Sequence, residues 1–156
     1  MLRWLGLSGA VIALDQATKL AAERLLTLYA PVEVIPSFNL TLMYNQGAAF
    51  SFLAGAGGWQ RWFFVLLAAG VSAVLVLWLK RLSPQERWTA AGLAMILGGA
   101  LGNLIDRLWH GHVIDFIDVY YGRYHWPAFN IADSAITVGA AILIVHGLFF
   151  QAKESR

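Results

Sequence analysis

Long uncharged apolar runs constrain this chain more than any other feature. Three of them are of similar length, at residues 62–79, 88–105 and 134–150. A helix needs about 20 mainly apolar residues to cross the hydrocarbon core of a bilayer, and each run is long enough to do so. A fourth run, at about residues 4–14, reaches that length only by including Asp15 and Lys19, which are spaced i, i+4 and can pair on one helical face. The sequence therefore predicts a mainly α membrane protein with four transmembrane helices.

The composition agrees with this fold class. Hydrophobic residues make up 59% of the 156 residues and charged residues 13%, whereas about 25% charged residues is usual in soluble domains. The length favours one integral membrane domain over residues 1–156. A net charge of +2 gives no argument for binding nucleic acid, and the absence of cysteine excludes disulfides, thiolate metal sites and a cysteine nucleophile.

The first apolar run has a second interpretation. Arg3 followed by the apolar stretch 4–14 is also the pattern of a cleaved signal peptide. However, no convincing small-residue cleavage site follows Leu14, and the sequence continues as a helix. We therefore expect a retained membrane helix.

Tryptophan and basic residues predict how the helices cross the membrane. Tryptophan prefers the two interfaces, and the seven tryptophans divide between them. One group is Trp4, Trp78 and Trp88, and the other is Trp59, Trp62, Trp109 and Trp126. The first surface carries six basic residues and the second carries five, two of which have acidic neighbours. The positive-inside rule then places both termini in the cytoplasm.

Polar side chains gather near the outer ends of the predicted helices. They are Asp15, Lys19, Asn103, Asp106, Arg107, Asp115 and Asp133. Asp115 and Asp133 lie at opposite ends of what we expect to be one short loop. A carboxylate in a membrane costs roughly 2.5–3.5 kcal/mol at the helix centre, so two that converge indicate function. Two adjacent carboxylates share a proton and supply one base and one acid, which is the chemistry of an aspartic protease.

Two further segments are expected on the same outer side. In 32–44, apolar and polar residues alternate from Phe38 onward, which predicts a strand with one apolar face after breaks at Pro31 and Pro36. Residues 45–47 are typical of a turn, and the short apolar stretch 48–53, followed by glycines, is expected to lie along the interface or over a pocket.

Five motifs in order along the chain resemble one family. They are Asp15-Gln16-Ala17-Thr18-Lys19, Asn45-Gln46-Gly47-Ala48-Ala49-Phe50, Gly102-Asn103-Leu104-Ile105-Asp106-Arg107, Val113-Ile114-Asp115-Phe116 and Phe129-Asn130-Ile131-Ala132-Asp133-Ser134. Through them the chain resembles the lipoprotein signal peptidases, also called type II signal peptidases. The resemblance implies a four-span bacterial inner-membrane aspartic protease with a small extracytoplasmic β element and a short interfacial helix.

The resemblance also implies substrate, inhibitor and site residues. The expected substrate is a prolipoprotein whose Cys carries a diacylglyceryl group, cleaved on the N-terminal side of that Cys, and the expected inhibitors are globomycin-type peptides. Asp115 and Asp133 are the expected catalytic pair, with membrane lipid around them and no cofactor or metal. The expected substrate-binding residues are Asn45, Asn103, Arg107, Asn130 and, in the apolar stretch, Phe50.

Several of these residues also have structural explanations. Asn130 and Asp133 fit the first turn of a helix, as cap and first-turn acid. Asp115 fits a solvated loop acid like Asp118. Asp15 with Lys19 is interpreted as a scaffold ion pair, and Asn103, Asp106 and Arg107 can form one buried polar cluster. Gly98 and Gly102 predict close helix packing.

Two alternative functions are weighed against the peptidase. His110-Gly111-His112 with Asp115 offers zinc ligands, although no His-Glu-x-x-His motif is present. A small proton-coupled transporter or relay could also use outer-leaflet carboxylates. Such a relay would step acids across the membrane, whereas here the acids are expected at one depth.

Overall fold

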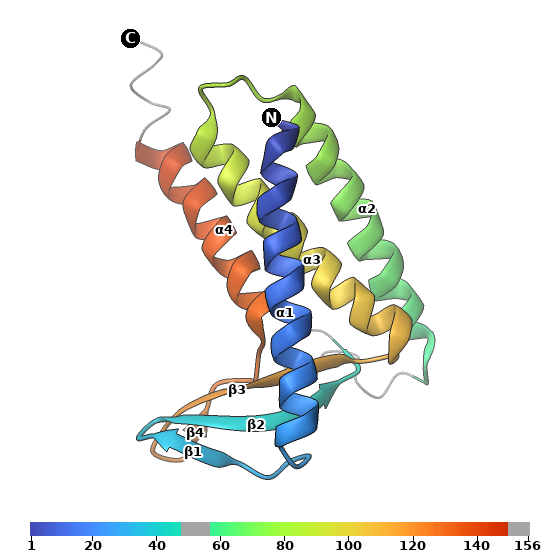
Figure 1. The fold of residues 1–156 in the computed structure, drawn as a ribbon, viewed down its shortest axis with the longest axis vertical. Coiled ribbons are helices and arrows are strands. Elements are labelled where there is room, and N and C mark those ends of the chain that lie inside the picture. The colour runs from blue at the N-terminus through green and yellow to red at the C-terminus, as the bar shows by residue number, and fades with distance from the viewer. Residues whose placement is uncertain (48–56, 150–156) are drawn as a thin grey trace.

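The computed structural model describes residues 1–47 and 57–149, which form a helical bundle with a small sheet at one end (Figure 1). The helices are a 3-10 turn at Leu2–Trp4, α1 at Leu5–Leu25, α2 at Trp59–Arg81, α3 at Arg87–Trp109 and α4 at Ile131–Phe149. The strands are β1 at Val32–Ile35, β2 at Phe38–Asn45, β3 at Val113–Tyr121 and β4 at Tyr124–His125.

In the described part of the chain, α2, α3 and α4 are long and apolar enough to cross a membrane. On α2, large apolar side chains are exposed, with Leu66 at 72% and Val74 at 61%, as expected for a surface that faces lipid. The first predicted span forms as α1, but its polar residues, among them Asp15 and Lys19, leave it outside this group. α1 nevertheless runs alongside the other helices in Figure 1.

Glycines bring α3 close to α1 and α4. A Cβ at Gly98 would lie 2.8 Å from the Cβ of Val11 in α1, and one at Gly102 would lie 2.6 Å from Oδ2 of Asp15. On the α4 side, a Cβ at Gly139 would lie 2.6 Å from the carbonyl oxygen of Gly92. The close packing predicted for Gly98 and Gly102 is therefore confirmed, and α3 is the central helix of the bundle.

The sheet is antiparallel, with the order β1-β2-β3-β4 within the described residues. Its central pair joins Asn45 at the end of β2 to Val113 at the start of β3, directly after α3. The segment between α3 and α4 is therefore not the short loop predicted from the sequence. Val113–Tyr121 is rich in β-branched and aromatic residues, which favour a strand, and Asp115 lies within it.

The alternation of apolar and polar residues in β2 does not give the simple apolar face that was predicted. Asn39 and Thr41 are buried, whereas Tyr44 is exposed. The physical reason is Asp118 in β3, whose Oδ2 accepts hydrogen bonds from Asn39 Nδ2 and Thr41 Oγ1, each at 3.2 Å. The register of β2 against β3 also shifts between Leu40 and Met43, which changes the side that later residues face.

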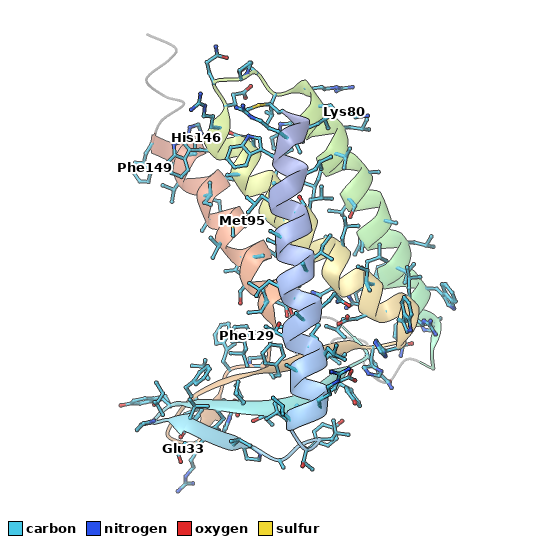
Figure 2. All side chains as sticks on the ribbon, in the orientation of Figure 1. Glu33, Lys80, Met95, Phe129, His146 and Phe149 are labelled. Carbon is cyan, nitrogen blue, oxygen red and sulfur yellow. The ribbon has the colours of Figure 1, made fainter. Side chains whose placement is uncertain are left out.

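The two ends of the bundle differ in chemistry. The N-terminus and the α2–α3 connection lie at the end away from the sheet in Figure 1. Figure 2 places Lys80 and His146 at that end and Phe129 where the sheet approaches α4. Trp59, Trp62 and Trp109 are exposed at the sheet end, and Trp78 and Trp88 at the other, as the sequence predicted. The sheet end holds the polar residues described next.

Candidate active site

The two predicted catalytic carboxylates come from different elements. Asp115 projects from β3, and Asp133 lies in the first turn of α4. Asn130 Oδ1 accepts a hydrogen bond from the Asp133 backbone N–H at 2.9 Å, and Asp133 Oδ2 accepts one from the Asn130 N–H at 3.4 Å. This reciprocal arrangement is a capping box, so Asp133 also has the structural role foreseen for it.

Asp15 on α1 also binds the start of α4. Its Oδ1 accepts a hydrogen bond from the backbone N–H of Ala132 at 2.9 Å. The first-turn N–H groups of a helix lack intrahelical partners, and a carboxylate there is favoured by the helix dipole. Asp15 on α1 therefore determines where Asp133 is presented.

Three asparagines hold the two carboxylates. Asn130 Nδ2 donates to Asp115 Oδ1 at 2.8 Å, and Asn45 Nδ2 donates to Asp115 Oδ2 at 3.2 Å. Asn103 Nδ2 donates to Asp133 Oδ1 at 2.8 Å. Asn130 Nδ2 also lies 3.1 Å from Asn103 Oδ1, which links the two carboxylate environments.

A buried ionic cluster supports these amides. Lys19 Nζ lies 2.7 Å from Asp15 Oδ2 and 2.7 Å from Asp106 Oδ2, and donates to Asn103 Oδ1 at 3.0 Å. The predicted Asp15–Lys19 pair is therefore confirmed and extended. Asp106 also accepts a hydrogen bond from the Ile114 N–H at 3.1 Å, which ties the ionic cluster to β3 beside Asp115.

The environment of Asp115 favours its protonated form. Its side chain is 2% exposed, and burial together with the nearby Asp133 carboxylate raises the pKa of Asp115 to about 7. Hydrogen bonds from Asn45 and Asn130 and the charge of Lys19 act in the opposite direction. Near neutral pH Asp115 can therefore retain its proton, as one member of an acid and base pair must.

A cavity of about 890 Å³ opens beside both carboxylates. It is bordered by β2, the end of α3, the start of β3, the segment before α4 and the first turns of α4. Five residues predicted for the site line it: Asn45, Asn103, Arg107, Asp115 and Asp133. Asn130 is fully buried and lies behind the carboxylates, where it orients them.

Arg107 connects α3 to the end of β2. Its Nη2 donates to the carbonyl oxygen of Gly47 at 2.9 Å, and its Nη1 donates to the carbonyl oxygen of Asn103 at 3.3 Å. The guanidinium lies 5.0 Å from the ring centre of Phe64, a cation–π arrangement. A fixed cation therefore borders the cavity close to the carboxylates.

The residue pattern matches a known family along most of the chain. The sequence profile described as Signal peptidase (SPase) II matches residues 7–149. This chain belongs to the signal peptidase II family. It is 57% identical over 156 residues to a lipoprotein signal peptidase of Pseudomonas putida, an alignment that covers 99% of this chain and 90% of that protein. It is 52% identical over 154 residues to one of Aeromonas hydrophila, covering 98% and 92%.

The fold of this signal peptidase II family member is also similar to a solved structure. That structure is described as a bacterial membrane enzyme determined by the in meso method at 2.3 Å resolution. The TM-score is 0.87 at 30% sequence identity, with 100% of this chain and 93% of that chain covered. The likeness therefore extends over the bundle and the sheet together.

Two expectations on the site have different outcomes. Phe50 and the apolar stretch 48–53, where the interfacial helix was expected, lie outside the described residues. Asp118 is not a solvated loop acid, because it is 3% exposed and its Oδ1 lies 2.8 Å from His125 Nδ1. Its partners lie on the neighbouring strands, which sequence spacing alone does not place.

The histidines of the possible zinc motif lie apart from the carboxylates. The ring of His112 packs against Tyr44 at 4.1 Å between centroids, and His110 lies 5.9 Å from His112. Within residues 1–47 and 57–149, no group of three His, Cys, Asp or Glu side chains is arranged to hold a metal ion.

One polar residue that holds the ionic cluster together, Gln16, was not predicted from the sequence. Gln16 Nε2 donates to Asp106 Oδ1 at 2.8 Å and so joins α1 to α3 beside Lys19. Its position between Asp15 and Lys19 in the first motif was the signal that could have identified it.

Proposed function

We propose that this chain is an aspartic endopeptidase that removes the signal peptide from prolipoproteins, cutting on the N-terminal side of a diacylglyceryl-modified Cys. The observation that carries the proposal is the pair Asp115 in β3 and Asp133 in α4. Asparagine side chains hold both carboxylates beside one cavity. Membership of the signal peptidase II family makes the chain a peptidase, and its relatives are named lipoprotein signal peptidases.

The mechanism is general acid–base hydrolysis without a covalent intermediate. The ionised carboxylate of the pair takes a proton from a water molecule, and the resulting hydroxide attacks the scissile carbonyl carbon. The protonated partner donates its proton to the carbonyl oxygen. The resulting tetrahedral intermediate collapses as its C–N bond breaks: the amine takes a proton from the carboxyl group that had received it from water, and a hydroxyl of the intermediate returns its proton to the other carboxylate as the C=O bond re-forms, which restores the singly protonated pair. Because the two groups are coupled, the shared proton belongs to the pair.

The substrate-binding role follows from the polar groups that border the cavity. A peptide that enters a partly apolar groove must have its backbone hydrogen-bonding groups satisfied. Asn45, Asn103 and Arg107 border the groove and are the groups that would receive substrate carbonyl and ester oxygens. The diacylglyceryl chains would remain in contact with membrane lipid, and a globomycin-type peptide would occupy the same groove.

The membrane placement that we propose comprises four spans in the bacterial inner membrane. α1 serves as the first span because Asp15 and Lys19 are paired inside the bundle, which removes most of the cost of placing them in lipid. Both termini would face the cytoplasm, and the sheet end would lie at the extracytoplasmic face. The interfacial helix and a single domain over residues 1–156 belong to the same proposal.

The transporter alternative finds no support. The buried ionisable groups described here gather at the sheet end of the bundle and do not form a path to the other end. The named relatives are peptidases.

Cleavage of a lipidated precursor by the purified chain tests the proposal. We expect Asp115→Asn and Asp133→Asn each to lower kcat by at least about a thousandfold, because each removes one member of the acid–base pair while preserving side-chain size. Glu33→Gln, an exposed carboxylate in β1, is the matched control and should retain activity. Normal turnover by either variant would refute the aspartic mechanism.

A second comparison tests which class of substrate the chain cleaves. The same precursor without its diacylglyceryl group should be cleaved much more slowly, since the acyl chains position the scissile bond. Equal rates on both precursors would leave a general membrane peptidase. EDTA should have no direct effect, and activity lost to EDTA and restored by zinc would instead favour the histidine site.

A further inference from the structure

A second cavity, of about 590 Å³, lies at the sheet end of the bundle between the start of α2 and the end of α3. Arg61, His110 and His112 line it, together with the backbone of Gly57 and Gly58. Asp115 and Asp133 line the other cavity, and Gln46 is the residue that borders both. The second cavity therefore adjoins the groove of the proposed peptidase without containing its carboxylates.

The described lining of this cavity is basic and contains no carboxylate. Arg61 has no ion pair among residues 1–47 and 57–149. Its Nη2 donates to the carbonyl oxygen of Leu108 at 2.8 Å, and its guanidinium lies 5.1 Å from the ring centre of Trp62. The cation is therefore held in place by neutral neighbours, and its charge is left without a counterion.

Two buried nitrogen atoms of this lining have no hydrogen-bond partner in the described structure. They are Nε of Arg61 and Nε2 of His112. A buried polar nitrogen without a partner is unfavourable and is rare in native proteins, so the Nε–H of Arg61 is open to a ligand. Burial and the neighbouring His110 lower the pKa of His112, which leaves Arg61 as the permanent positive charge.

The start of α2 adds further donors. Gly58 precedes the helix in a left-handed conformation, with φ of 98°, and donates its N–H to Oε1 of Gln60 at 2.7 Å. The glycine has no side chain to cap the N–H groups that follow it in the first turn. The first N–H groups of a helix lack internal partners and carry partial positive charge, which favours an anion. This helix start borders the same cavity as the Arg61 guanidinium.

The depth of the cavity indicates which anion reaches it. Trp62 lines it, and Trp59 and Trp109 are next in sequence to residues that line it. These side chains are 56%, 54% and 81% exposed, as expected in the interfacial layer of a bilayer. The anions abundant in that layer are the phosphodiester groups of phospholipids. A phosphate oxygen matches Arg61 and free N–H donors well, because charge-assisted hydrogen bonds to phosphate are strong.

We propose that this cavity binds the headgroup phosphate of an anionic phospholipid from the outer leaflet, with Arg61 supplying the charge and the backbone N–H groups at the start of α2 supplying neutral donors. The inference rests on the proposed placement of the sheet end at the membrane surface. It does not depend on the aspartic mechanism. The lipid would pack beside the substrate groove and occupy the space next to Gln46.

Lipid binding by the purified full chain tests this site. Native mass spectrometry would measure affinity for phosphatidylglycerol, for phosphatidylcholine and for inorganic phosphate. We expect wild type to prefer phosphatidylglycerol, and Arg61→Gln to weaken that binding by about tenfold, as expected for the loss of one charge-assisted contact. Arg123→Gln, which removes an exposed charge from the β3–β4 turn at the same end, should bind within about twofold of wild type.

Two controls keep the outcomes distinct. Arg61→Gln should retain cleavage in phospholipid-free detergent, which shows that it folds, and Asp115→Asn should retain the preference for phosphatidylglycerol although it cannot cleave. Equal phosphatidylglycerol binding by wild type and Arg61→Gln would overturn the proposal. So would binding of inorganic phosphate without any preference for the anionic lipid. If Arg61→Gln does not fold, Arg61→Lys takes its place and should show an intermediate affinity.

Discussion

Lys19 occupies a position from which its side chain determines the orientation of the Asn103 amide. Lys19 is 1% exposed, and its ammonium contacts Asp15, Asp106 and Asn103. Since Lys19 donates to Asn103 Oδ1, the Nδ2 of Asn103 must face Asp133. Reversing that amide would place donors opposite the ammonium and remove the hydrogen bond from Asn103 to Asp133. Lys19 therefore acts on the carboxylates as a positioning residue.

We expect Lys19→Met to lower kcat strongly while KM stays within about twofold, because Lys19 does not itself line the cavity and acts through Asn103. Stability should fall by about 3–5 kcal/mol, the usual result of leaving buried carboxylates unpaired. Steady-state kinetics and thermal unfolding would measure both. Lys80→Met, an exposed residue at the other end of the bundle, is the control. A rise in KM with unchanged kcat would contradict the positioning role.

The raised pKa of Asp115 predicts a dependence of stability on pH. The pKa is about 7 in the folded chain and 3.8 in the reference state, so the folded state binds the proton more tightly. The stabilising contribution is therefore complete below about pH 4 and is lost as pH rises through 7. From pH 5 to 8, the free energy of unfolding should fall by on the order of 3 kcal/mol from this group.

Thermal unfolding of wild type and Asp115→Asn at pH 5 and pH 8 would measure that contribution. The variant cannot ionise at residue 115, so its melting temperature should fall less between the two pH values. Glu33→Gln should follow wild type, because Glu33 is exposed. An identical pH dependence in wild type and Asp115→Asn would mean that Asp115 already ionises normally.

Individual site residues differ in how far the sequence could predict them. Asp115 and Asp133 could be proposed because carboxylates beside apolar runs are costly, and the capping role of Asn130 followed from its spacing to Asp133. Asp118 could not be placed, because its burial depends on Asn39 and Thr41 of another strand. The same holds for Asn45, whose contact with Asp115 requires the pairing of β2 with β3.

At the scale of elements, the helices were predicted well and the sheet only in part. The apolar runs identified α2, α3 and α4, and each helix extends beyond or shifts from its run because interfacial polar residues such as Arg61 and Arg107 remain helical. β3 was taken as part of a loop because its two aspartates interrupt the apolar pattern. Both aspartates are buried in polar pockets, which local hydropathy does not reveal.

The α3–α4 contact gives an element-scale prediction. A Cβ at Gly99 would collide with the carbonyl oxygen of Ala132 and lie 2.7 Å from Cγ1 of Ile136. Gly99→Ala should therefore push the start of α4 away from Asn103, destabilise the protein by about 1–3 kcal/mol and lower kcat. Thermal unfolding and kinetics would measure the two effects.

The matched control for this substitution is Gly9→Ala. A Cβ at Gly9 meets nothing within 4 Å, so the change should leave activity intact and stabilise α1 by up to about 1 kcal/mol. Unchanged stability and activity in Gly99→Ala would show that α4 does not depend on the close approach at this glycine.

At the scale of the whole molecule, the two ends of the helical bundle differ in structure and in their polar groups. The sheet, both cavities and the buried ionic cluster lie at one end, and the N-terminus and the α2–α3 connection lie at the other. A peptidase that acts on exported precursors needs its site at the outer surface. The surface predicted to hold both termini carries six basic residues against five at the other, which favours the same orientation through the positive-inside rule.

Cysteine labelling provides a direct test of this orientation, since the chain contains no native cysteine. Ser37 is exposed in the turn between β1 and β2, and Ser83 is exposed in the connection between α2 and α3. In intact cells, an impermeant thiol reagent should label Ser37→Cys and should not label Ser83→Cys. After membrane disruption both should be labelled, because both positions are accessible to water. Labelling of Ser83→Cys with protection of Ser37→Cys in intact cells would place the carboxylates on the cytoplasmic side, where a peptidase for exported precursors could not meet its substrate.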